Sequence, residues 1–121
     1  MILVDSSIWI DHLRRRDEQL SALLEAGQVM THAFVVGELA LGNIAGRTRF
    51  LQLLDDLPQA QPATDAEVRA FIENHALAGR GIGYADTHLL AAARLNAAPL
   101  WTRDKRLAVM AGKLELLART Q

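Results

Sequence analysis

Residues 1–10 read MILVDSSIWI, and this opening stretch is the part of the sequence that decides the fold class. Residues 2–4 form a short, continuous aliphatic run, which is typical of a strand that is buried on both faces. Asp5, Ser6 and Ser7 follow at once, and these residue types favour turns and helix N-caps. Apolar residues at helical spacing then extend over residues 8–13. A buried strand that passes directly into a helix predicts an α/β protein.

Short apolar runs and helical patterns keep alternating along the rest of the chain. Further strands are predicted at residues 29–31, 99–102 and 114–117. Helices are predicted wherever apolar residues recur at helical spacing between caps and glycine or proline stops, namely at residues 17–26, 34–41, 45–57, 65–78, 85–97 and 104–111. This alternation predicts a three-layer α/β/α sandwich with a central, mostly parallel sheet of about four or five short strands.

Composition and charge narrow the class of protein further. The chain has 121 residues, half of them hydrophobic and 22% charged, which is typical of one globular domain spanning residues 1–121. It has no cysteine, so disulfide scaffolds, thiolate metal sites and cysteine nucleophiles are excluded. A net charge of −1 argues against a protein that coats nucleic acid by charge alone. Because no segment has the roughly 18–20 apolar residues that a membrane span needs, we expect a cytoplasmic protein.

Four carboxylates follow predicted strands or open the helices beside them. Asp5 follows the first strand, Asp104 follows the strand at 99–102, and Glu38 lies a few residues beyond the second strand. Asp86 lies in the first turn of a predicted helix, directly after a glycine-rich loop. Because the carboxyl ends of parallel strands meet at one edge of a sheet, we expect these four side chains to lie there together.

These four acids have apolar neighbours in the sequence, so gathering them in a pocket would raise their pKa values through burial and mutual repulsion. A divalent cation resolves that conflict, and an all-oxygen ligand set suits Mg²⁺ or Mn²⁺ rather than zinc. Each aspartate taken alone could equally be a helix cap, but Glu38, between Val36 and Leu39, has no capping role to fill. The set of four therefore points to a metal centre suited to phosphodiester cleavage.

Four motifs occur in order along nearly the whole chain, from Ile2 to at least Leu107: DSS at 5–7, ELALG at 38–42, DTHLLA at 86–91 and TRD at 102–104. Together they resemble the PIN-domain ribonucleases, in particular the VapC-type toxins of VapBC (type II) toxin–antitoxin pairs. The resemblance implies a Mg²⁺- or Mn²⁺-dependent endoribonuclease that cuts tRNA or other structured RNA. It also implies a homodimer and a small antitoxin whose peptide blocks the active site.

The resemblance also assigns roles to individual residues. Asp5, Glu38, Asp86 and Asp104 match the family's catalytic, metal-binding acids, and the hydroxyls of Thr102 and Ser6 match supporting positions. A metal-activated water attacking in line would leave a 5′ phosphate and a 3′ hydroxyl. Such a reaction does not use the ribose 2′-OH, so the choice of RNA over DNA rests on the resemblance.

Basic side chains near two of the acidic motifs are candidates for contacts to the RNA backbone, which would position the substrate without reading its sequence. They are Arg14, Arg15, Arg103 and Arg106. The first two fit an ordinary solvated helix end equally well.

Three other functions remain open at this point. A PIN-domain nuclease of RNA processing would have the same residues without a toxin role. A phosphoacceptor signalling domain also uses aspartates at strand ends and Mg²⁺, although Lys105 is poorly placed for the lysine that such a domain requires. In a binding-only module, the acids would serve folding or hold an arginine of a partner.

Overall fold

A computed structural model describes residues 1–119 and places a parallel three-stranded sheet at the centre of the chain. The strands are β1 (Ile2–Val4), β2 (Val29–Met30) and β3 (Leu100–Trp101), in the order β2-β1-β3. The first strand of the chain, β1, is therefore the central strand of the sheet. Its residue Leu3 pairs with Met30 of β2 on one side and with Leu100 of β3 on the other. Leu3 and Val4 are fully buried, as their uninterrupted aliphatic run predicts.

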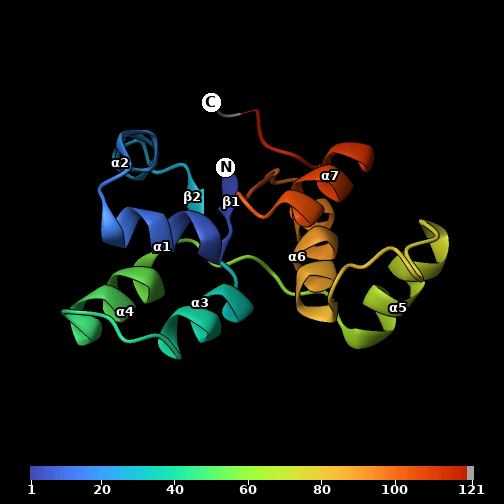
Figure 1. The fold of residues 1–121 in the computed structure, drawn as a ribbon, viewed down its shortest axis with the longest axis horizontal. Coiled ribbons are helices and arrows are strands. Elements are labelled where there is room, and N and C mark those ends of the chain that lie inside the picture. The colour runs from blue at the N-terminus through green and yellow to red at the C-terminus, as the bar shows by residue number, and fades with distance from the viewer. Residues whose placement is uncertain (120–121) are drawn as a thin grey trace.

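Within residues 1–119, seven helices surround this sheet. They are α1 (Ser6–Arg14), α2 (Glu18–Glu25), α3 (Ala33–Ala40), α4 (Arg47–Asp56), α5 (Asp65–Asn74), α6 (Tyr84–Leu95) and α7 (Lys105–Lys113). Figure 1 shows α1 to α4 grouped on one side of the strands and α5 to α7 grouped on the other. Helices on both sides of a parallel sheet make the α/β sandwich that the sequence predicts.

The helix α6 is the most deeply buried of these helices. Seven consecutive residues, 87 to 93, are buried, and the small side chains Ala91, Ala92 and Ala93 let it pack closely against its neighbours. It contacts both β3 and α5, and its partly exposed first turn carries Asp86 at the edge of this buried segment. None of the helices in residues 1–119 combines the length and the apolar composition that crossing a bilayer requires.

Two details differ from the sequence-based expectations. The sheet has three strands within the described residues, and only single bridges, Thr31 to Gln59 and Leu100 to Leu117, extend it. The segment at 114–117 is therefore a turn and a bridge rather than a strand. The helix expected at 65–78 ends at Asn74, because Ala76 adopts a left-handed backbone (φ 52°) that turns Leu77 into the core.

Candidate active site

The structure brings together the four acids expected at the carboxyl edge of the sheet. Asp5 follows β1, Glu38 lies on α3, Asp86 lies in the first turn of α6, and Asp104 is the N-cap of α7. Burial, followed by the charges of Asp5, Asp104 and Glu38, raises the pKa of Asp86 to about 6. The four acids thus lie near one another at this edge of the sheet, and their catalytic and metal-binding roles stay predictions.

Asp5 is the best-anchored of these acids. Its side chain is 5% exposed, and its Oδ2 accepts hydrogen bonds from the hydroxyls of Ser7 (2.7 Å) and Thr102 (2.8 Å). The backbone N–H of Ser7 donates to the same oxygen at 3.4 Å. All hydrogen bonds to this carboxylate from residues 1–119 thus fall on Oδ2. The other oxygen remains available to an external ligand.

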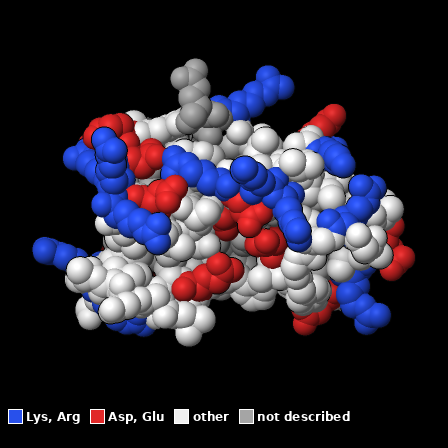
Figure 2. Space-filling model, viewed as in Figure 1, with Lys and Arg blue, Asp and Glu red and all other residues white. Residues whose placement is uncertain are grey.

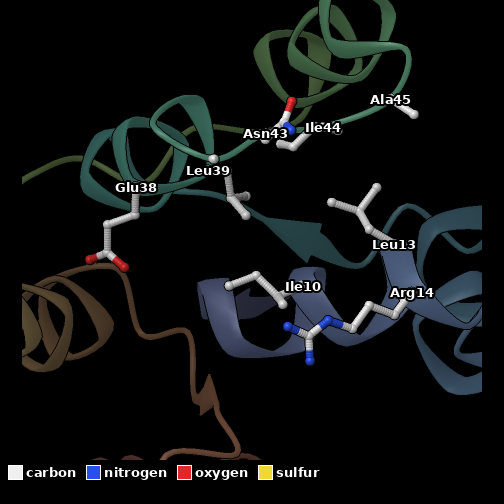
Figure 3. Close-up of a pocket in the computed structure, with 9 residues that line it drawn as sticks. Ile10, Leu13, Arg14, Glu38, Leu39, Asn43, Ile44 and Ala45 are labelled. Atoms are coloured by element: carbon white, nitrogen blue, oxygen red, sulfur yellow. The ribbon is translucent and has the colours of Figure 1, made fainter.

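Glu38 is oriented from a second element. Ser6, at the start of α1, donates its hydroxyl hydrogen bond to Glu38 Oε2 at 2.9 Å. The carboxylate is exposed, although Val35 and Leu39 on the same helix are buried. The apolar surroundings that the sequence suggested thus come from adjacent side chains of α3 that turn into the core, while Glu38 itself stays exposed. In Figure 3, Glu38 points toward the segment between β3 and α7, where Thr102 and Asp104 lie.

Thr102 links Asp5 to Asp104. Its hydroxyl donates to Asp5 and accepts the backbone N–H of Asp104 at 3.1 Å. Asp104 in turn accepts the backbone N–H of Leu107 at 3.0 Å through Oδ1, which caps α7. The supporting positions expected for Thr102 and Ser6 therefore coincide with direct hydrogen bonds to two different acids.

Ser7 is a site residue that the sequence analysis missed. Besides donating to Asp5, its hydroxyl accepts the backbone N–H of Arg103 at 3.0 Å, so it ties α1 to the segment that carries Asp104. The sequence does contain a signal for it, because two adjacent hydroxyl residues follow Asp5 at a helix start. Either can cap the helix there, and only the tertiary structure shows that each contacts a different carboxylate.

The four candidate RNA-contacting arginines have different environments. Arg103 donates to Asp11 (2.9 Å) and Asp17 (2.6 Å) and lies 5.6 Å from the Trp101 ring centre, so its guanidinium is already engaged within the protein. Arg106 is exposed and its guanidinium lies beside Gly81. Arg14 and Arg15 are exposed at the end of α1. In Figure 2, acidic side chains gather near the centre of one face and Lys and Arg side chains border them.

A cavity of about 400 Å³ lies between α1 and the end of α3, next to Glu38. Its walls are mainly aliphatic and come from Ile10, Leu13, Leu39 and Ile44, with Arg14 at its edge. Ile10 and Leu13 are about two-fifths exposed. This aliphatic surface directly adjoins the acidic site.

The donor set is suitable for a hard divalent cation. Four carboxylates, with no cysteine in the chain, form the oxygen-only environment that Mg²⁺ and Mn²⁺ prefer. Burial, and then repulsion by the neighbouring acids, raises the pKa of Asp86, and a bound cation would offset both effects. As the side chains stand in residues 1–119, however, no three acids or histidines converge as a ligand group.

Comparison with known proteins identifies similar chains. The family model described as PIN domain matches residues 2–113. Ribonuclease VapC32 of Mycobacterium tuberculosis, in strains CDC 1551 / Oshkosh and H37Rv, is 46% identical over 108 residues, covering 88% of this chain and 87% of the relative.

Two solved structures share the fold. One is the structure of FitAB bound to an IR36 DNA fragment, with a TM-score of 0.63 and 20% identity over 93% of this chain and 91% of that one. The other is the crystal structure of FitAcB from Neisseria gonorrhoeae, with a TM-score of 0.63 and 24% identity over 93% and 94% of the two chains.

Proposed function

The chain belongs to the PIN domain family, and from this premise we propose that it is a divalent-metal-dependent endoribonuclease that hydrolyses RNA phosphodiester bonds. We take residues 1–121 as a single nuclease domain. The relative that is 46% identical over most of the chain is named a ribonuclease, which supports RNA as the substrate. Mg²⁺ or Mn²⁺ is the proposed cofactor.

One observation carries the proposal, namely the grouping of four carboxylates from separate elements, two of which are oriented by the hydroxyls of Ser6, Ser7 and Thr102. Three carboxylates from three other elements lie close enough to make ionisation of this partly buried side chain unfavourable. A fold does not gather four like charges without a compensating group, because the repulsion destabilises it. A carboxylate with a raised pKa, lying among other acids at the carboxyl edge of a parallel sheet, is typical of a catalytic site.

We assign the residues distinct tasks. Asp5, Glu38, Asp86 and Asp104 would hold the cation, and Ser7, Thr102 and Ser6 would keep Asp5 and Glu38 in fixed orientations through their hydroxyl groups. When bound, Mg²⁺ or Mn²⁺ supplies an activated water and stabilises the charge on the leaving oxygen. The exposed Arg106 and Arg14 would contact substrate phosphates.

A toxin role forms the second part of the proposal. The resemblance to VapBC toxins, together with the similarity to VapC32, supports a small antitoxin as the cognate partner and a homodimer as the assembly. The aliphatic cavity beside Glu38, with a volume of about 400 Å³, offers a protein partner an apolar site next to one of the acids. The alternative to the toxin role is an RNA-processing nuclease that has no antitoxin, and it leaves the proposed nuclease activity unchanged.

The decisive test is cleavage of a total-RNA pool by the purified protein in Mg²⁺ or Mn²⁺, compared with EDTA. Discrete cuts that carry a 5′ phosphate and a 3′ hydroxyl, and that are lost in Asp5→Asn, are the expected result. Glu25→Gln, an exposed carboxylate at the end of α2, is the matched control and should cleave like the wild type. Products ending in a 2′,3′-cyclic phosphate, or cleavage that persists in EDTA, would overturn the mechanism.

A further inference from the structure

The exposed aromatic rings of this chain are unevenly distributed. Of its six aromatic side chains, only Phe34 (40% exposed) and Tyr84 (48% exposed) present a large area to solvent. Trp9, Trp101 and Phe71 are buried, and Phe50 is half-buried against Trp9. All six rings lie within the described residues. Because an aromatic side chain usually packs in the core, the two exposed rings call for a functional explanation.

The exposed rings are connected to the acidic site through α3. Phe34 is one helical turn before Glu38 on α3, and residues four apart share a helix face. Tyr84 is two residues before Asp86 at the start of α6. Both rings contact the imidazole of His88, and the centroid of each ring lies 4.7 Å from the centroid of that imidazole. They thus flank one buried ring, and Phe34 connects this group to the face of α3 that carries Glu38.

Contacts behind the rings hold them in place. The hydroxyl of Tyr84 donates to Asp65 Oδ1 at 2.7 Å, and His88 Nε2 donates to the same oxygen at 3.2 Å. On the other side, His32 accepts the backbone N–H of Phe34 at 2.9 Å, and its ring lies 5.2 Å from the Phe34 ring. Both histidines are at most 3% exposed. The two aromatic rings are therefore preorganised, which lowers the entropic cost of binding a ligand.

We propose that Phe34 and Tyr84 form a stacking platform for a nucleobase of the RNA next to the cleaved bond. The inference rests on the proposed function, because a base is tethered within one nucleotide of the phosphate that the carboxylates would process. Aromatic side chains stack on any base, so the platform would hold the strand without selecting its sequence. The aliphatic cavity on the far side of Glu38 has no aromatic ring and lacks this chemistry.

The test uses a short single-stranded RNA that carries 2-aminopurine, whose fluorescence is quenched by stacking, with Ca²⁺ replacing Mg²⁺ to suppress cleavage. Wild-type protein should quench the probe on binding. Phe34→Leu and Tyr84→Leu should each weaken binding by about 5- to 100-fold and restore the fluorescence. Phe34→Tyr and Tyr84→Phe keep the rings and should retain the quench. Val109→Ala, which trims an exposed apolar side chain on α7, is the matched control.

The possible outcomes separate the platform from the nuclease. No quench with the wild type, or unchanged affinity and fluorescence in both leucine variants, would overturn the platform even if the protein cleaves RNA. A quench that the leucine variants abolish would support the platform even if no cleavage were found. If size-exclusion chromatography shows that the leucine variants change the oligomeric state while RNA binding is unaffected, the face is a protein interface and the proposal is wrong.

Discussion

Asp86 is the residue whose electrostatic environment departs most from that of a carboxylate in water. Its pKa of about 6, against an ordinary value of 3.8, means that the folded protein holds this proton more tightly than the unfolded chain does. The contribution of Asp86 to stability is therefore most favourable below about pH 4 and is lost as the pH rises through about 6. Above that range, the ionised side chain destabilises the metal-free fold.

Asp86→Asn should remove this destabilisation, because the amide does not titrate. In EDTA, the free energy of unfolding of the variant should exceed that of the wild type by an amount that grows from about pH 4 to about pH 6 and then stays constant. Denaturant unfolding across this pH range measures the difference. Two parallel stability curves would show that Asp86 has an ordinary pKa in the fold.

Ser7 is expected to act by positioning Asp5. Ser7→Ala removes the 2.7 Å hydrogen bond to Asp5 Oδ2 and leaves Thr102 as the remaining hydroxyl donor. Groups that orient a metal ligand typically contribute about 10- to 100-fold to metal affinity or activity, so a loss of this size in Mn²⁺ affinity is expected. Calorimetric titration would measure it, with Ser21→Ala, a serine on α2 that is remote from the acids, as the control. Equal affinity in both variants would remove Ser7 from the site.

At this scale, the sequence identifies charged residues better than their partners. Asp5, Asp86 and Asp104 could be predicted because each follows a strand or opens a helix, and Glu38 because it is a carboxylate in an apolar helical segment that follows a strand. The engagement of Arg103 by Asp11 and Asp17 could not be predicted, because these residues are 92 and 86 positions from it along the chain. The sequence shows only that Arg103 adjoins Asp104.

At the scale of elements, Arg103 joins the segment between β3 and α7 to α1 and α2. One guanidinium nitrogen reaches Asp11 on α1, and the other reaches Asp17, the N-cap of α2. The backbone N–H of Leu20, followed by Arg103, lowers the pKa of Asp17. The link therefore stabilises the fold above the ordinary pKa of Asp17 and is lost as the pH falls below it. It also restrains Thr102 and Asp104 on either side of Arg103.

Arg103→Ala should therefore resemble the double variant Asp11→Asn with Asp17→Asn. Both should lower stability by about 1 kcal/mol, since the pairs are partly exposed, and both should slow RNA cleavage. The salt dependence of RNA affinity should be the same for Arg103→Ala and the wild type. If Arg103 instead contacts a phosphate, its removal would reduce the salt slope by about one, and the double variant would bind RNA more tightly.

The helix ends show why boundaries are harder to predict than elements. Helix α2 ends before Gly27 at φ 67°, as glycine stops predict, but α5, α6 and α7 are followed by Ala76, Ala97 and Glu115 in the same left-handed conformation. In each case the next residue, Leu77, Ala98 or Leu116, is buried. Tertiary packing of that apolar residue ends the helix, and local sequence does not record it. The missing fourth strand has a similar cause, because residues 114–117 are used for such a turn and one bridge.

At the scale of the whole molecule, the acidic site lies between the two groups of helices. Asp5 caps α1 and Glu38 lies on α3, whereas Asp86 lies on α6 and Asp104 caps α7. Figure 1 shows α1 and α3 in one group of helices and α6 and α7 in the other. Repulsion among the four charges thus acts between the two sides of the sheet. The overall layering follows from the alternation of strands and helices, so this placement could be predicted from the sequence together with the four acids.

A cation bound at this position would link the two sides and stabilise the entire fold. Adding Mn²⁺ should raise the thermal unfolding midpoint of the wild type, with a gain of about 2.7 kcal/mol when the free ion is at 100 times its dissociation constant. Asp5→Asn should show a much smaller rise, because it removes the most firmly oriented carboxylate. Glu25→Gln removes a carboxylate outside the site and should respond like the wild type. An equal rise in all three proteins would mean that Mn²⁺ acts through general charge screening. The four acids would then not form a specific cation-binding site.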